Sequence, residues 1–325
     1  MISVVIALYN KERHIARAIQ SVLGQTCGDF ELVIVDDGST DEGAKVVESF
    51  NDRRIRSIHQ QNAGVSAARN RGVAEARADL IAFLDADDEW KPDYLEAIIS
   101  LRERFPHAAA WTTTFDMVSP SGILQSWAGT IQILEGNSSE GIIDYFSRKG
   151  DPFYSSSITI QKDAFLSIGG FPVGFIRGED NDTWLRLALK YPIAWSSFSK
   201  VIRYANADNR IYTNDYLLTG VRPEFESLMR HIDEQVGRKH VNEDIIRYVM
   251  SRHRTTLMNN LISGNRGAIK QIAADHRVIG YWIRGIAIEA MAYVPPLAYI
   301  LLKKIKCKLY NRPYKTLPAR NILKT

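Results

Sequence analysis

Short, mostly apolar runs alternate with segments of helical periodicity through residues 2–104. Each run is long enough for one buried strand but too short for a helix. The runs are Ile2–Leu8, Phe30–Val35, Ile55–His59 and Leu80–Leu84. Strands that are apolar on both faces are typical of a parallel sheet with helices on both sides. The pattern therefore predicts an α/β fold.

The segments between these runs carry apolar residues at helical spacing. Helices are expected over residues 15–23, after the turn at Gly64, and over residues 93–104. Parallel strands need right-handed crossovers, which place the strand ends near residues 9, 36–37 and 85–88 along one edge of the sheet. Because ligands of α/β folds bind at that edge, we expect three loops to form one crevice there.

The middle of the chain is less regular. Residues 108–117 are predicted to form a strand, residues 122–141 a loop and residues 163–168 a short helix. Helical periodicity returns at residues 181–189, so Glu179 and Asp180 would lie at a helix N-terminus. The helix dipole stabilises carboxylates there, and capping is one interpretation of this pair.

An acidic cluster follows the fourth apolar run. Asp85 and Asp87, separated only by Ala86, would project to the same side of an extended chain. Two crowded carboxylates repel each other unless a positive charge lies between them, and a hard divalent cation with oxygen ligands supplies one. The alternative interpretation is that Asp87 or Asp88 caps the helix that starts near Pro92.

The three converging loops carry a set of side chains suited to a nucleoside diphosphate. Tyr9 offers an aromatic face, Asp37 a hydrogen-bond acceptor and Arg69 a guanidinium, beside the metal pair Asp85 and Asp87. The chain has neither G-x-G-x-x-G after its first strand nor G-x-x-x-x-G-K-[ST], which argues against dinucleotide binding and P-loop chemistry.

The composition is that of an ordinary globular protein. The 325 residues are 45% hydrophobic and 24% charged, which is enough for a core and an appended region. Cys27 and Cys307 show no metal-type spacing, so two reduced thiols in a cytosolic protein are expected. The chain opens on an apolar strand without a preceding basic region, which argues against a signal peptide.

Charge is unevenly distributed. The formal net charge is +4, yet the residues from Lys303 onward include eight basic and no acidic side chains, so the first 302 residues carry −4. A basic terminus of this kind indicates an anionic surface as partner. Nucleic acid is the weaker interpretation, because no recognised nucleic-acid-binding motif accompanies the lysines.

Six segments resemble the inverting family 2 glycosyltransferases of the GT-A fold, in their order and spacing, across residues 1–205. They are SVVIALYNKERHIARAIQSVLGQT (3–26), FELVIVDDGSTD (30–41), NAGVSAARNRG (62–72), IAFLDADDEWKPDYL (81–95), GGFP (169–172) and GEDNDTWLRL (178–187). The resemblance implies a Rossmann-like, mostly parallel sheet with flanking helices over residues 1–213, followed by a C-terminal helical region over 214–325.

The resemblance also implies roles on the donor side. Tyr9 would stack on the nucleotide base, Asp37 would accept a hydrogen bond from it, and Arg69 would lie beside it. Asp85 would touch the ribose or order the metal shell, and Asp87 would bind Mn²⁺ or Mg²⁺ directly. Two small residues, Ala7 and Ala86, would line the same nucleotide-sugar site.

On the acceptor side, the resemblance implies that Asp180 is the catalytic base, with Glu179 as second choice. Family members often have a metal-binding histidine after this region, but residues 201–210 contain none. Asn206, Asp208 or a water could complete the metal shell. The expected activity is metal-dependent, inverting transfer from a UDP-sugar to a glycan or lipid-linked acceptor in surface polysaccharide biosynthesis. The alternatives are a sugar nucleotidyltransferase and a non-catalytic nucleotide-sugar or glycan-binding module.

The last third of the chain has a helical pattern. Helices are expected over residues 214–236, 241–263 and 265–279. The apolar stretch 278–302 is divided by Pro295-Pro296, which leaves pieces too short for a typical spanning helix. Its aromatic residues and the lysines that follow favour a helix lying in the membrane interface. Core or oligomer packing and true spanning are the alternatives, and the expected location is peripheral, at the inner face of the cell membrane.

Overall fold

The computed structural model describes residues 1–207, apart from 120, 123, 128–129, 150–152 and 176, together with 266–278 and isolated positions between 227 and 261. The chain divides into two compact units, Met1–Asn209 and Arg210–Thr325. The boundary predicted between residues 213 and 214 lies outside the described residues and stays a prediction.

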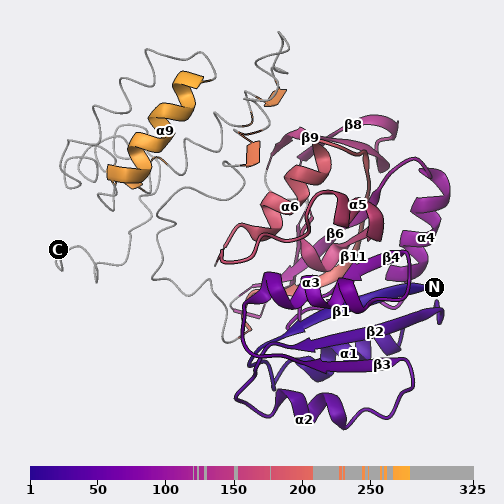
Figure 1. The fold of residues 1–325 in the computed structure, drawn as a ribbon. Coiled ribbons are helices and arrows are strands. Elements are labelled where there is room, and N and C mark those ends of the chain that lie inside the picture. Colours follow the sequence, from indigo (N-terminus) through magenta and orange to yellow (C-terminus); the bar gives the residue numbers. More distant parts are fainter. Residues whose placement is uncertain are drawn as a thin grey trace. The chain divides into compact units, whose positions relative to one another are not determined.

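Four parallel strands open the first unit, at the positions that the apolar runs predict. They are β1 (Ile2–Leu8), β2 (Phe30–Asp36), β3 (Ile55–His59) and β4 (Leu80–Phe83), in the spatial order β3-β2-β1-β4 (Figure 1). The register between β1 and β2 runs from Ile2 opposite Phe30 to Leu8 opposite Asp36. The carboxyl ends of these strands therefore meet at one edge, as predicted.

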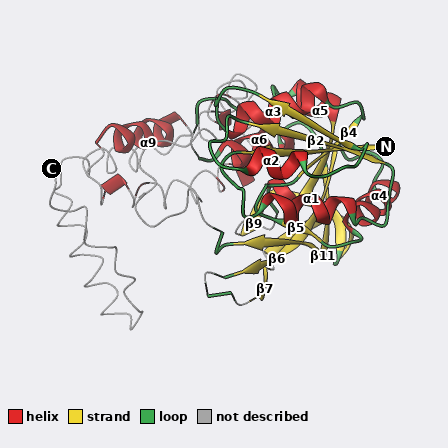
Figure 2. Cartoon of the chain, turned by 90° about the horizontal axis from the view of Figure 1, so that it is seen from below, coloured by secondary structure: helices red, strands yellow, loops and turns green. Residues whose placement is uncertain are grey.

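Helices cover both faces of these strands, because successive side chains of a strand point to opposite sides. The helices are α1 (Ile15–Leu23), α2 (Gly43–Glu48), α3 (Val65–Glu75) and α4 (Tyr94–Arg104) (Figure 1, Figure 2). Val33 and Val35 pack with Ala68 of α3, whereas Leu32 and Ile34 belong to the core cluster that includes the buried face of α1. The two-sided burial explains why β1, β2 and β4 consist mainly of apolar residues.

The remaining strands make the sheet mixed. Among the described residues, eleven strands form one sheet, which continues from β4 through β10 (Ile158–Gln161), β6 (Ala110–Val118) and β11 (Ile193–Tyr204). β10 is antiparallel to both β4 and β6, and β11 runs parallel to β6. The short strand β5 (Glu89–Trp90) pairs with the C-terminal end of β11. The predicted α/β class is confirmed, with an antiparallel part that the apolar runs do not predict.

Three short elements complete the site region. They are the 3₁₀ turn η1 (Ser155–Ser157), α5 (Lys162–Ser167) and α6 (Glu179–Ala188). Helix α6 begins at Glu179, with Gly178 at the N-cap in the left-handed region at φ 82°. Glu179 and Asp180 therefore lie in the first turn of a helix, as predicted.

The prediction of a loop over residues 122–141 is wrong. This region contains β7 (Leu124–Trp127) and β8 (Thr130–Asn137), and β9 (Glu140–Lys149) forms a hairpin with β8. Two glycines of this region pair with each other across the hairpin, Gly136 opposite Gly141. A Cβ at Gly141 would lie 2.1 Å from the carbonyl oxygen of Glu135. Close backbone approach, rather than a loop, explains both glycines.

Of the second unit, the longest described element is helix α9 (Arg266–Val278), which confirms the helix predicted over 265–279. Ile269 and Ile272 of α9 cluster with Leu261. The helices predicted over 214–236 and 241–263 and the stretch 278–302 lie wholly or largely outside the described residues. Across the part of the chain that the structure describes, no helix combines the length and the apolar character needed to cross a membrane.

Candidate active site

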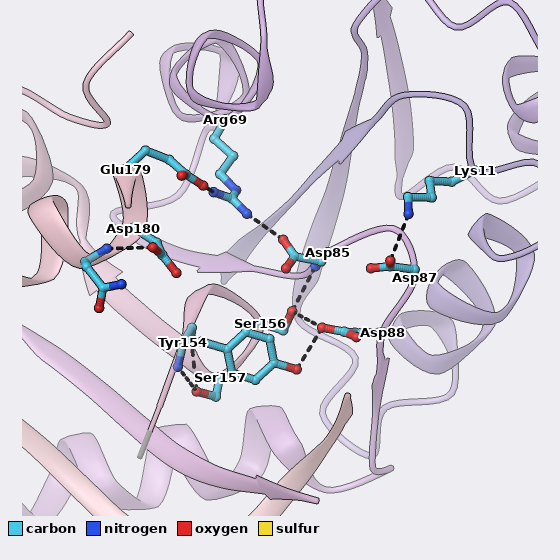
Figure 3. Close-up of polar contacts among 11 residues, drawn as sticks. Lys11, Arg69, Asp85, Asp87, Asp88, Tyr154, Ser156, Ser157, Glu179 and Asp180 are labelled. Atoms are coloured by element: carbon cyan, nitrogen blue, oxygen red, sulfur yellow. Dashed lines mark hydrogen bonds and ion pairs between the residues drawn. The ribbon is translucent and has the colours of Figure 1, made fainter. Parts of the chain in front are cut away.

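A buried guanidinium joins the predicted donor side to the predicted acceptor side. Arg69 of α3 donates from Nη2 to Asp85 Oδ1 at 2.6 Å and from Nη1 to Glu179 Oε1 at 3.2 Å (Figure 3). Asp85 lies two residues after the end of β4, and Glu179 opens α6. The fold thus brings together three charged residues from three distant segments at the carboxyl edge of the sheet.

Arg69 is charged in this setting. Its side chain is almost fully buried and lies over the ring of Phe171, 5.0 Å from the ring centre. Burial by itself lowers the pKa of Arg69, but the negative charges of Asp85 and Glu179 outweigh burial and raise that pKa above its ordinary value. A buried charge of this kind is stable only with hydrogen-bonded partners, so the three side chains form one unit.

Asp87 has a cationic partner of its own. Lys11 donates from Nζ to Asp87 Oδ2 at 2.9 Å, and both side chains are mostly buried. The guanidinium of Arg17 in α1 donates to the carbonyl oxygen of Asp87 at 2.6 Å. Lys11 belongs to the loop after β1, and sequence reasoning did not assign it to the site. Its signal was its place beside Tyr9, at the end of a strand whose neighbours carry the acidic residues.

Asp88 lies on the other side of the same turn and is completely buried. Its Oδ2 accepts hydrogen bonds from the hydroxyl groups of Tyr154, at 2.7 Å, and Ser156, at 2.8 Å. Burial, and next the charge of Asp88, raise the pKa of Tyr154 well above its ordinary value, so its hydroxyl stays a proton donor. Asp93 occupies the N-cap position of α4, so the alternative that Asp87 or Asp88 caps that helix is wrong.

The pair at the start of α6 differs in its contacts. Glu179 faces Arg69, whereas Oδ1 of Asp180 accepts a hydrogen bond from the backbone N–H of Asn181 at 2.7 Å (Figure 3). Burial, and then the negative charge of Asp180, raise the pKa of Glu179 to about 7, although Arg69 opposes the shift. Capping alone does not describe Glu179, because its side chain leaves the helix to meet a residue of α3.

Asp37 is buried and holds the loop before α3. Its Oδ1 accepts from Gln60 Nε2 at 2.7 Å and from the N–H of Ala63 at 2.9 Å, and its Oδ2 accepts from the N–H of Gly64 at 2.8 Å. These bonds fix the entry of the helix that carries Arg69. The predicted contact between Asp37 and a nucleotide base stays a prediction.

The other predicted nucleotide-binding residues lie near the same edge. Tyr9 follows β1 and is exposed, with 44% of its surface accessible. Ala7 is near the end of β1, opposite Val35, and Ala86 is buried between the two acidic residues of the turn.

The carboxylate oxygens of Asp85 and Asp87 can supply some, but not all, of the ligands of a hard cation. Among the described residues, no group of three or more His, Cys, Asp or Glu side chains is arranged to hold a metal ion. Mg²⁺ is commonly bound by one or two carboxylates that act together with substrate phosphates and waters. Asp85 and Asp87 could supply these one or two carboxylates. Of the predicted third ligands, Asn206 is exposed and Asp208 lies outside the described residues.

Comparison with protein families agrees with the geometry. Residues 3–156 match the family model described as "Glycosyl transferase family 2". The N-terminal unit is a family 2 glycosyltransferase domain. The match includes the residues from Tyr9 to Asp88, while Glu179 and Asp180 lie beyond it. Family membership favours the glycosyltransferase prediction over the nucleotidyltransferase alternative.

Relatives of this family 2 domain share only part of their length with it. An uncharacterised glycosyltransferase of Nostoc sp. is 48% identical over 103 residues, which is 31% of this chain and 32% of the relative. Glycosyltransferase GlyG of Streptococcus pneumoniae is 36% identical over 101 residues, 30% of this chain and 34% of the relative. The chain thus spans about a third of the length of these relatives.

The similarity to solved structures extends over nearly the whole chain. Residues 1–349 of S. aureus TarS, crystallised with UDP-GlcNAc, superpose with a TM-score of 0.69 and 15% sequence identity. The superposition covers 97% of this chain and 93% of that one. At this identity the likeness concerns the fold, and it shows the GT-A fold predicted from the sequence.

Proposed function

We propose that this chain transfers a sugar from a UDP-sugar to a hydroxyl group of a glycan or lipid-linked acceptor. The observation that carries the proposal is the Arg69 bridge between Asp85 and Glu179. Sugar transfer needs a departing diphosphate and an attacking hydroxyl at adjacent places, and the bridge joins Asp85 on the donor side to Glu179, the neighbour of the proposed base Asp180. Family membership supports the reaction class, and the TarS complex with UDP-GlcNAc supports a UDP-sugar donor.

On the donor side, Asp85 and Asp87 would bind a Mn²⁺ or Mg²⁺ ion that acts as a Lewis acid on the diphosphate. In the chain itself, Arg69 and Lys11 neutralise these two carboxylates. The two cations also supply charge that favours a bound diphosphate, because ammonium and guanidinium groups both pair well with phosphate oxygens. Tyr9 would stack on the base from the rim of the site.

On the acceptor side, Asp180 would remove the proton of the attacking hydroxyl, which is a weak nucleophile until it is deprotonated. We assign the base to Asp180 because Glu179 is already paired with Arg69. Through that ion pair, Glu179 would orient the start of α6, where Asp180 lies. A single base facing the leaving group across the sugar gives inversion in one displacement, as in inverting glycoside chemistry.

The proposal is tested with a panel of nucleotide sugars, assayed for Mn²⁺-dependent release of nucleoside diphosphate with and without acceptor glycans. Turnover confined to UDP-sugars is the expected result. Asp180→Asn should keep wild-type donor affinity and lose transfer, whereas Glu179→Gln should retain measurable transfer. Equal transfer by Asp180→Asn and wild type would place the base elsewhere, and absence of turnover with every donor would contradict the function.

The C-terminal sequence supports a proposal for the acceptor and for the location. The apolar, aromatic stretch 278–302 and the eight basic residues after it suit the surface of a membrane rich in anionic lipid. We therefore propose a peripheral location at the inner face of the cell membrane. A lipid-linked intermediate of surface polysaccharide would be within reach of the enzyme there.

A further inference from the structure

The turn that carries Asp85 and Asp87 is closed by a ring of hydrogen bonds through Ser156. The backbone N–H of Asp88 donates to the carbonyl oxygen of Asp85 at 3.0 Å. The N–H of Asp85 donates to Ser156 Oγ at 3.1 Å, and the Ser156 hydroxyl donates to Asp88 Oδ2 at 2.8 Å (Figure 3). The ring links both ends of the turn to one buried side chain of a distant segment.

The direction of these bonds follows from the chemistry of the groups. An ionised carboxylate only accepts, and a serine hydroxyl has a single proton. Because Ser156 gives that proton to Asp88, its lone pairs are the groups that face the N–H of Asp85. Trp90 Nε1 donates to the carbonyl oxygen of Ser156 at 2.7 Å and so holds the serine backbone as well. Asp88 thus orients Ser156, and Ser156 holds Asp85.

Asp88 is itself held firmly. Its Oδ2 also accepts from the Tyr154 hydroxyl, and its Oδ1 accepts from the backbone N–H of Tyr204, near the end of β11, at 3.1 Å. A buried carboxylate with three donors resists rotation, since rotation would leave a buried charge unpaired. The Asp85–Asp88 turn is therefore anchored to η1 and to β11.

We propose that Asp88 and Ser156 are positioning residues, which fix the turn so that the carboxylates of Asp85 and Asp87 stay in the arrangement that binds the donor. The inference rests on the proposed function, because donor binding is what the arrangement serves. Asp85 and Asp87 repel each other, so a loose turn would let them separate when Lys11 and Arg69 pair with a bound diphosphate instead. The third acidic residue of the DADD segment then has a role distinct from the other two.

The experiment compares two neighbouring buried serines. Ser156→Ala removes the bonds to Asp85 and Asp88. Ser157→Ala removes hydroxyl contacts with the backbone N–H and carbonyl of Tyr154, at 3.1 Å each, and with the Thr112 hydroxyl at 3.3 Å. UDP binding by the full chain is measured by calorimetry with and without Mn²⁺, and Mn²⁺ binding by electron paramagnetic resonance. Ser156→Ala should weaken Mn²⁺-dependent UDP binding about 10- to 100-fold, the usual range for residues that support metal ligands. Ser157→Ala should keep wild-type affinity.

Asp88→Asn provides the second variant. It should weaken binding in the same direction, and the double variant with Ser156→Ala should lose less affinity than the sum of the two single losses, because Asp88 acts on Asp85 in part through Ser156. Equal affinities of the two serine variants, or additive losses in the double variant, would overturn the inference. If Ser156→Ala does not show the circular dichroism spectrum of the folded wild type, the UDP affinities of Asp88→Asn and Ser157→Ala are compared instead. Wild-type protein that binds no UDP would overturn the proposed function together with this inference.

Discussion

Glu179 should make the first unit less stable as the pH rises. Its pKa is raised from the ordinary 4.5 to about 7 by burial and by the charge of Asp180. The folded state therefore binds more protons than the unfolded state between these values, so the stabilising contribution is complete below pH 4.5 and is lost as the pH rises through 7. At about 1.4 kcal/mol per pKa unit, the loss between pH 5 and pH 8 is about 2 to 3 kcal/mol.

Glu179→Gln removes this loss, because the amide stays neutral at every pH. Scanning calorimetry of wild type and Glu179→Gln from pH 5 to pH 8 measures the effect. At about 2–4 °C per kcal/mol, the Tm of Glu179→Gln minus that of wild type should increase by roughly 4–12 °C over this range. Glu103→Gln, at an exposed position of α4, serves as the control and should show a constant difference. A Glu179→Gln difference that stays flat or decreases with pH would refute the reasoning.

Three further outcomes are expected. Asp87→Ala should remove the Mn²⁺-dependent part of UDP binding in calorimetry, and unchanged affinity would exclude Asp87 as a ligand. Gly72→Ala should destabilise the first unit by about 1–3 kcal/mol in urea unfolding, since its Cβ would lie 2.3 Å from Val5 Cγ1, whereas Gly28→Ala meets nothing within 4 Å and should be near neutral. Deletion of residues 278–325 should abolish co-sedimentation with anionic liposomes, and retained binding would disprove the proposed membrane contact.

Much of the first unit could be predicted because its local signals agree with one another. The runs that become β1, β2 and β4 are mostly apolar, and polar or glycine-containing turns bound all four runs, so each strand was placed within a residue or two. The hairpin of β8 and β9 was missed because it depends on pairing between strands. In the sequence, Gly136 and Gly141 resemble loop residues. In the fold, each allows the backbone of the facing strand to approach closely.

The sequence by itself determined that Asp85 and Asp87 stand at a strand end and that Glu179 and Asp180 start a helix. Both follow from short-range periodicity, which is local to the chain. Only the tertiary structure decided the partners: Arg69 between Asp85 and Glu179, Lys11 at Asp87, and Ser156 at Asp88. These residues are between 16 and 110 positions apart. Which charges meet is set by the order of strands in the sheet, and the spacing of residues along the chain carries no record of that order.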